Sequence, residues 1–411
     1  MQSNYKPIGK YIREVKTRNT DGSISRLLGV NIDKYFMPSV ANIIGTDLTK
    51  YKVVKKGQFA CNQMHVGRDE RLPVALSTSE EDFLVSPAYD VFEIKDENIL
   101  NPEYLMMWFS RKEFDRNAWF YTDADVRGGL HWKAFCEMTL PIPSLEKQKE
   151  IVAEYNTIAN RIKLNEELNR KLEETAQAIY KHWFVDFEFP DKNGQPYKSS
   201  GGEMEYEPLL EIEIPKGWSV KELGDLCMVK GGKRLPKGES LTEANTGHPY
   251  IKVADMCSAK YIVLSNNIEC VPEDIQKAIA NYTVNRKDLI LSIVGTIGLV
   301  NIVHDNLDGA NLTENCVKLT KFSELNPEYL YEYLKSSLGQ KEIEMKTVGG
   351  VQGKLPLYNI KAIRILCPKE DVFDRYSKII AVLDAKQICS AQQLPQLDVM
   401  KHILNAKMSI V

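Results

Sequence analysis

The sequence predicts an α+β protein that contains one structural unit twice, each copy being a globular domain followed by a long helix. Three observations support this prediction: an internal repeat, two long helical segments with the periodicity of a coiled coil, and a polar Gly/Ser-containing segment between the copies. The chain has 411 residues, enough for two or three domains that each bury a hydrophobic core. A single small domain is therefore excluded.

The internal repeat rests on landmarks that recur in the same order. Residues 101–105, Asn-Pro-Glu-Tyr-Leu, occur again 225 positions later as residues 326–330. Each copy is expected to begin a helix, with the asparagine as N-cap and the proline at the first helical position. Pro143 and Pro368 are also 225 positions apart, and each ends a short apolar strand. Several landmarks in one order indicate a duplication.

The first long helix is expected to begin at Ser144, a suitable N-cap. Neither glycine nor proline follows Ser144 before Pro190, so about 40 residues can be helical, a length of about 60 Å. Its seam positions alternate in steps of four and three residues, as a coiled coil requires. The seam residues are Ile151, Tyr155, Ile158, Ile162, Asn165, Asn169, Leu172, Ala176, Ile179 and Trp183.

The second long helix repeats this seam 225 positions later. Pro395 is expected to kink or locally break it, because proline lacks the amide hydrogen. Neither helix has the wide apolar face needed to pack on its own domain, so mutual antiparallel pairing is favoured over separate packing. The second seam contains Tyr376, Ile380, Leu383, Gln387, Ser390, Leu394, Leu397, Lys401, Leu404 and Met408.

These features divide the chain into five segments. The two globular domains are expected at residues 1–143 and 217–367, where short β-rich runs alternate with turns rich in Gly, Pro and Asn. The long helices are expected at residues 144–189 and 368–411, and a polar linker at residues 190–216.

Composition bounds the class of protein. The formal net charge of −3 argues against a protein that coats nucleic acid by bulk charge, although residues 1–68 carry twelve Lys and Arg against four Asp and Glu.

No segment approaches the roughly 18 uninterrupted apolar residues of a membrane span, and the N-terminal residues are polar. A cytoplasmic protein with no membrane partner is therefore expected. The eight cysteines contain no C-x-x-C pair, which is typical of reduced structural cysteines.

The common catalytic motifs are missing from the sequence. The Gly-Lys pairs are followed by Tyr11, Arg234 and Leu355 rather than by the Ser or Thr of a phosphate-binding loop. The Asn-Pro sequences continue with glutamate rather than the second proline of an adenine methyltransferase, and Pro190-Asp191 is not followed within about 30 residues by the Glu/Asp-x-Lys triplet of a restriction-type nuclease. The six histidines show no ligand spacing. No catalytic residue, metal or cofactor is expected in this chain.

Glycine-containing basic loops are candidates for DNA contact, because cations bind phosphates while Arg, Lys, Asn and Gln read base edges. Such loops occur in both globular domains, and their recurrence favours DNA contact over ordinary turns. The candidate residues are Gln63, Arg68, Arg127, His131 and Lys133 in the first domain, and Lys230, Lys233, Arg234, Lys237, Gln352 and Lys354 in the second.

Two segments carry a resemblance to a known family. Residues 172–187, LEETAQAIYKHWFVDF, and residues 214–218, Ile-Pro-Lys-Gly-Trp, followed by Leu-Gly-Asp at 223–225, resemble the specificity subunit of Type I restriction-modification enzymes. The resemblance covers essentially the whole chain, although the first domain lacks the Ile-Pro-x-Gly-Trp sequence and starts almost at once with residues 8–10.

The resemblance implies a non-catalytic protein with two target-recognition domains that bind a bipartite sequence of double-stranded DNA. The pair of long helices would act as a ruler for the spacer between the two halves of the target. The implied partners are two modification subunits, which methylate adenine, and restriction subunits, which cleave DNA. S-adenosylmethionine, ATP and magnesium are expected in those partner subunits.

Two other hypotheses remain open at the level of the sequence. The chain could be a coiled-coil scaffold that joins protein partners and does not bind DNA, in which case no affinity for a duplex would exist. It could also be an unrecognised nuclease or methyltransferase, in which case the isolated chain would show turnover with magnesium or S-adenosylmethionine.

Overall fold

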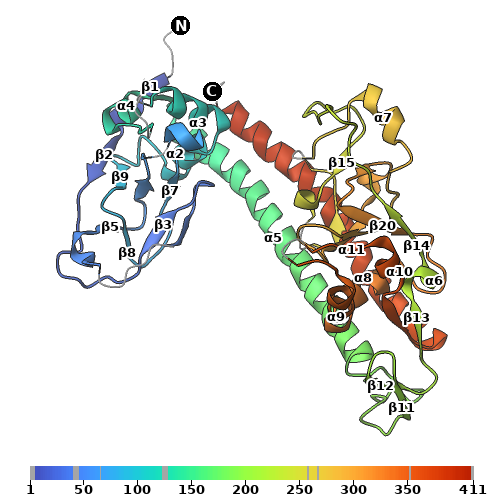
Figure 1. The fold of residues 1–411 in the computed structure, drawn as a ribbon. Coiled ribbons are helices and arrows are strands. Elements are labelled where there is room, and N and C mark those ends of the chain that lie inside the picture. Colours follow the sequence, from blue (N-terminus) through green and yellow to red (C-terminus); the bar gives the residue numbers. More distant parts are fainter. Residues whose placement is uncertain are drawn as a thin grey trace. The chain divides into compact units, whose positions relative to one another are not determined.

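The computed structural model describes residues 5–39, 46–64, 66–122, 128–256, 259–265, 268–350 and 353–408. The chain forms two compact units, residues 1–161 with 397–411 and residues 162–396. Each unit has its own sheets (Figure 1). Each also has its own hydrophobic core. The α+β class predicted from the sequence is confirmed.

The first unit is built on a four-stranded antiparallel sheet with the order β2-β9-β6-β7. The sheet strands are β2 (Ile12–Val15), β6 (Phe59–Cys61), β7 (Val74–Leu76) and β9 (Asp90–Ile94); the paired short strands are β1 (Tyr5–Pro7) with β10 (Thr139–Pro141), β3 (Leu28–Val30) with β4 (Phe36–Pro38), and β5 (Lys52–Val54) with β8 (Phe83–Val85). The helices are α1 (Val66–Asp69), α2 (Pro102–Phe109), α3 (Lys112–Phe120) and α4 (Trp132–Glu137). Its core is aromatic, with Phe59 stacked on Phe92 at 4.9 Å between ring centroids.

The second unit contains a five-stranded sheet with the order β14-β20-β17-β18-β16, antiparallel except for the β16-β18 pair. Its strands are β14 (Met228–Gly231), β16 (Tyr261–Ile262), β17 (Leu289–Ser292), β18 (Val300–Val303) and β20 (Cys316–Thr320). The remaining elements are β11 (Met204–Glu207), β12 (Ile212–Pro215), β13 (Ser219–Glu222), β15 (Tyr250–Ile251), β19 (Asn311–Leu312), β21 (Arg364–Cys367), α6 (Leu223–Leu226), α7 (Glu273–Ile279), α8 (Pro327–Lys335), α9 (Ser337–Lys346) and α10 (Leu357–Lys361).

Both copies of the repeated pentapeptide begin a helix, as predicted. The Asn101 side chain accepts a hydrogen bond from Tyr104 N at 3.0 Å and caps α2. Asn326 accepts from Tyr329 N at 2.8 Å and caps α8 in the same way. A proline occupies the start of each helix, where its missing amide hydrogen costs no helical bond. The repeat in the sequence is therefore also a repeat in local structure.

The two long helices are α5 (Leu145–Phe184) and α11 (Glu370–Lys407), 40 and 38 residues long (Figure 1). In the second unit, Asn165 Nδ2 donates to Gln393 Oε1 at 3.2 Å, and the rings of Tyr180 and Tyr376 lie 6.4 Å apart. Higher-numbered residues of α5 contact lower-numbered residues of α11, so the helices are antiparallel, as the fold prediction required. All the positions assigned to the two seams are buried or half-buried.

Pro395 does not break the second helix, so the predicted break does not occur. Helix α11 continues through Pro395. The proline removes one helical hydrogen bond, but Ala391 and Leu394 on the preceding turn remain buried and half-buried, respectively. The packing of Ala391 and Leu394 is therefore retained where the bond is lost.

The segment predicted as a polar linker, residues 190–216, has regular structure. It contains the antiparallel hairpin β11-β12. Phe189 stacks on Tyr197 at 4.6 Å and on Trp218 at 5.3 Å between ring centroids. These aromatic contacts belong to the core of the second unit, so the segment is folded there rather than extended as a free connection.

A buried ionic cluster joins α8 and α11 to the start of β16 in the second unit. Lys260 Nζ lies 2.6 Å from Asp384 Oδ1 and 3.8 Å from Glu332 Oε1, and the Lys260 side chain is 0% exposed. Burial raises the pKa of Asp384, and it raises the pKa of Glu332 to about 8, although Lys260 opposes both shifts. Nearby, Lys335 of α8 lies 3.1 Å from Glu173 of α5. Ion pairs thus link the globular part of this unit to both long helices.

We expect Asp384→Ala to lower the free energy of unfolding by about 3–5 kcal/mol, because it leaves the Lys260 ammonium buried without its nearest counter-charge. Chemical denaturation would measure the change. Glu174→Ala is the control: Glu174 pairs with Arg170 at 2.7 Å, but its side chain is 59% exposed, so its loss should cost less than about 1 kcal/mol. Equal effects of the two variants would contradict this account.

We also expect the stability of the second unit to fall as pH rises from about 5 to about 8. Folded Glu332 keeps its proton up to a pKa of about 8, whereas its ordinary pKa is 4.5. The folded state therefore binds more protons than the unfolded state across this range, and its advantage is lost as pH rises through the folded pKa. Denaturation curves of the wild type and of Glu332→Gln, measured across this range, should diverge, with the flatter dependence in the variant. Parallel curves would refute the assignment.

Candidate nucleic-acid interface

The basic loop at residues 230–238 includes the last two residues of β14 and continues beyond it at one end of the five-stranded sheet. Lys233 N donates to Leu312 O at 2.8 Å. A Cβ atom on Gly232 would lie 2.0 Å from Thr313 O, so a side chain at this position would clash with the neighbouring backbone. Glycine therefore allows the loop to run in close contact with the segment between β19 and β20.

A second candidate loop reaches the same end of the sheet. Ser292, the last residue of β17, pairs with Cys316, the first residue of β20. Just beyond this pair, Leu355 N donates to Ile293 O at 3.0 Å. Lys354 precedes Leu355, so it lies beside the end of β17. The register of three strands thus brings together loops that are more than 100 residues apart in the sequence.

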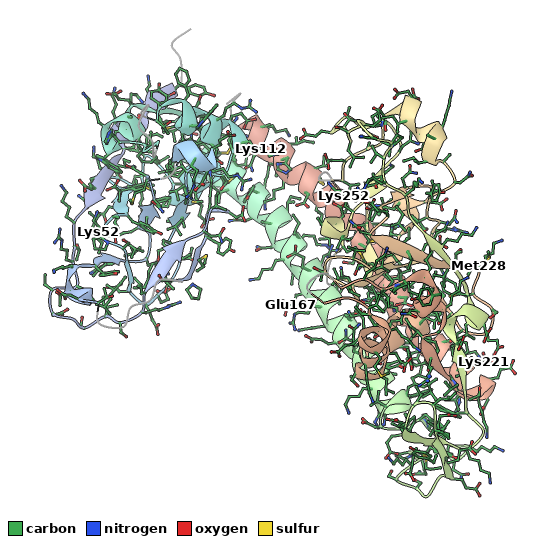
Figure 2. All side chains as sticks on the ribbon, in the orientation of Figure 1. Lys52, Lys112, Glu167, Lys221, Met228 and Lys252 are labelled. Atoms are coloured by element: carbon green, nitrogen blue, oxygen red, sulfur yellow. The ribbon has the colours of Figure 1, made fainter. Side chains whose placement is uncertain are left out.

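The candidate cations of the second domain are exposed on these segments: Lys230, Lys233, Arg234, Lys237 and Lys354. Figure 2 shows the side chains of this domain on the ribbon and labels Met228, the first residue of β14. Lys233 Nζ lies 5.7 Å from the centre of the Tyr282 ring. Residues 230–238 contain four cations and no acidic residue, so this loop can contact a phosphate backbone.

Arg234 differs from the other cations of this loop because an acidic side chain holds it. Its Nε donates to Glu314 Oε1 at 2.6 Å. Burial raises the pKa of Glu314, but hydrogen bonds from Arg234, from its own backbone amide and from Thr313 outweigh that effect and lower the pKa. The carboxylate is therefore ionised at neutral pH, and the pair is charge-assisted.

Glu314 was not among the residues proposed from the sequence. It lies 80 residues after Arg234, and the pairing of β14 with β20 brings the two side chains together. No sequence motif marks this position, because the contact depends on strand register.

In the first domain, two candidate loops also meet through glycine. Gly67 N donates to Gly128 O at 2.7 Å, and a Cβ atom on Gly67 would lie 2.7 Å from Gly128 Cα. Arg68 is exposed, and its Nε donates to Asp69 Oδ1 at 2.6 Å. This arrangement brings Arg68 close to the loop that leads to α4.

His131 and Lys133, at the start of α4, are exposed. Arg127 and Gln352 lie outside the residues that the structure describes. The structure therefore places exposed candidate residues near the Gly67–Gly128 contact of the first domain and near the Gly232–Thr313 contact of the second.

The structure corrects the proposal for Gln63. This residue is 8% exposed, and its carbonyl accepts a hydrogen bond from Leu130 N at 3.0 Å. The backbone of Gln63 thus joins its own loop to the loop that precedes α4, and the residue is buried between them. Its side chain lies in the interior rather than on a surface that a duplex could contact. The sequence around a glutamine next to a basic loop does not show whether its side chain is buried or exposed.

Within the described parts of the chain, no cluster of three or more His, Cys, Asp and Glu residues has the geometry to hold a metal ion. The same residues include no helix long and apolar enough to cross a membrane.

The family model for the "Type I restriction modification DNA specificity domain" matches residues 74–174 and 215–397. These two segments make up more than half of the chain, which therefore belongs to this family. One matched segment lies mainly in each half of the duplicated chain and each extends into a long helix. The match thus follows the repeat.

Individual specificity subunits of Type I restriction enzymes are also similar to this chain in sequence or in fold. The specificity subunit of the Type I restriction enzyme MjaIX from Methanocaldococcus jannaschii is 26% identical over 317 residues, which cover 74% of this chain and 68% of the relative. The specificity subunit of HindI from Haemophilus influenzae is 22% identical over 425 aligned positions, covering 90% of both chains. The structure of a Type I S subunit from M. genitalium has a TM-score of 0.56 at 14% identity and covers 98% of this chain and 95% of its own. This last likeness shows a shared fold.

Substitution at Gly232 tests the close contact of the basic loop. We expect Gly232→Ala to displace the loop and to lower the free energy of unfolding by about 1–3 kcal/mol, because the new methyl group meets a backbone carbonyl. Gly231→Ala is the matched control, since nothing lies within 4 Å of a Cβ atom at that position. Denaturation midpoints and affinity for a DNA duplex should both fall in the first variant. A similar loss in the control would mean that the contact with Thr313 is not the cause.

Proposed function

We propose that this chain is the DNA-sequence specificity subunit of a Type I restriction-modification complex. The observation that carries the proposal is the family match in two segments, one for each half of the duplicated chain. Each half also presents exposed cations beside a glycine contact that holds two loops together. Two recognition domains of this kind would read the two halves of a bipartite duplex target.

The long antiparallel helices would set the length of the spacer between the two half-sites. An α-helix rises by a fixed 1.5 Å per residue, and the pair is held in register by contacts such as that between Asn165 and Gln393. Rigid elements of this kind suit a ruler, because a change in the separation of the half-sites would require the helices to bend or slip.

We propose that the chemistry takes place in partner subunits. Two modification subunits would supply adenine methylation with S-adenosylmethionine, and restriction subunits would supply cleavage with ATP and magnesium. This chain would bind both kinds of partner in the cytoplasm and direct them to the target, without a cofactor or catalytic group of its own.

Domain exchange tests the function. The full chain, assembled with purified modification subunits, should methylate and bind one split sequence. Replacing residues 1–143 or 217–367 with the matching part of another family member should change one half of that sequence and leave the other half intact. Methylation-site sequencing and gel-shift assays would measure the outcome. Binding that is independent of sequence would overturn the proposal.

The same assembly separates the competing hypotheses. If the exposed cations contact phosphates, the logarithm of the duplex affinity should fall linearly with the logarithm of the salt concentration. A protein scaffold would show no duplex affinity at any salt concentration. Turnover by the isolated chain with magnesium or S-adenosylmethionine would instead identify an enzyme.

A further inference from the structure

The pair formed by Arg234 and Glu314 has a geometry suited to reading a base. The Arg234 side chain is 78% exposed although its Nε is bonded to Glu314, whose side chain is 30% exposed. Among the described residues, Glu314 is the acceptor that the Arg234 guanidinium contacts. Its two terminal nitrogens are therefore left for a partner from outside the chain.

The backbone that leads into Arg234 is fixed at the two preceding residues. The close approach of Gly232 to Thr313 O and the bond from Lys233 N to Leu312 O hold the loop against its neighbour. The Tyr250 hydroxyl donates to Lys233 O at 2.9 Å. A side chain that is already held loses less rotamer freedom when it binds, so this arginine is preorganised.

Glu314 is fixed as well. Thr313 Oγ1 donates to Glu314 Oε2 at 3.1 Å, while the Arg234 guanidinium occupies Oε1. The carboxylate follows β19 and lies two residues before β20, and Cys316 N donates to Thr313 O at 3.2 Å across this turn. Both partners of the ion pair thus lie on connecting segments whose backbones are hydrogen-bonded close to the ends of β14, β19 and β20.

We infer that Arg234 reads a guanine in the major groove of the half-site bound by the second domain, with Glu314 as the positioning residue. This inference rests on the proposed function. The two terminal nitrogens of a guanidinium match the O6 and N7 acceptors of guanine, and this is the commonest specific contact between an arginine and a base. Glu314 holds Nε and so restricts the plane in which the other two nitrogens lie.

The neighbouring lysines fit a different role. Lys230, Lys233 and Lys237 are exposed on the same loop, and an ammonium group is a compact point charge without a planar pair of donors. They suit phosphate contacts, which position a duplex without reading its sequence. Arg234 would then supply discrimination, whereas the lysines would supply affinity.

The test uses the full chain assembled with its modification subunits and a duplex whose target has been found by methylation-site sequencing. The half-site assigned to the second domain by domain exchange should contain a guanine whose replacement by 7-deazaguanine, which lacks N7, lowers affinity about tenfold or more. Arg234→Ala should bind the two duplexes with nearly equal affinity. Its preferences at all other positions should be unchanged.

Two controls separate reading from charge and from folding. Lys237→Ala removes a cation from the same loop and should weaken binding to both duplexes alike, with the guanine preference intact. Glu314→Ala should reduce the guanine preference while the denaturation midpoint stays near that of the wild type. A purely structural ion pair would instead lower the midpoint and weaken binding to all sequences equally.

Several results would overturn the inference and leave the proposed function standing. These are a half-site without guanine, a guanine preference that survives in Arg234→Ala, or a uniform loss of affinity in that variant without a change in sequence preference. If the wild-type assembly shows no sequence preference at all, the proposed function itself fails. The 7-deazaguanine measurement on the wild type needs no variant and stands even if a substitution prevents folding.

Discussion

Each globular domain is joined to its long helix by a buried hydrogen bond from a tyrosine hydroxyl. Tyr104 Oη donates to Pro141 O at 3.2 Å, and Tyr329 Oη donates to Leu366 O at 2.7 Å. The two acceptors lie on β10 and β21, the strands that lead into α5 and α11. The first turn of α5 adds Gln148, which is 0% exposed and accepts from the backbone of the α2 cap. The placement of the candidate loops depends on these junctions, because a domain that could rotate on its helix would not present its loops in a fixed direction.

The sequence was informative where structure depends on local periodicity. The repeated helix caps and the alternating seam were visible because capping and coiled-coil pairing each need a few residues at fixed spacing. The break predicted at Pro395 does not occur, because a helix interior can lose one hydrogen bond when the packing around it is retained. The polar composition of residues 190–216 likewise hid a hairpin that is stabilised by aromatic contacts from outside the segment.

The candidate interface was predictable only in part. Basic residues beside glycines can be found in a sequence, but the grouping of Lys233 with Lys354 follows from the register of β14, β20 and β17. The sequence also did not show which candidate side chains are exposed, since Gln63 is buried while Arg68, five residues later, is exposed. The buried pair of Lys260 and Asp384 joins residues 124 positions apart, and no local pattern marks either one. Long-range contacts of this kind need the fold itself.

The two halves use the same physical device with different residues. In each domain a glycine lets two backbones approach closely, which places charged side chains on a rigid edge: Gly67 against Gly128 in the first domain, and Gly232 against Thr313 in the second. Because the paired loops are not equivalent positions of the repeat, the side chains that they present differ. If the chain has the proposed function, these unequal loops would read two unlike half-sites from a duplicated scaffold. On the proposed function, the supports of each domain lie in buried contacts, whereas the residues proposed to contact DNA lie on exposed loops, where a substitution disturbs the core least.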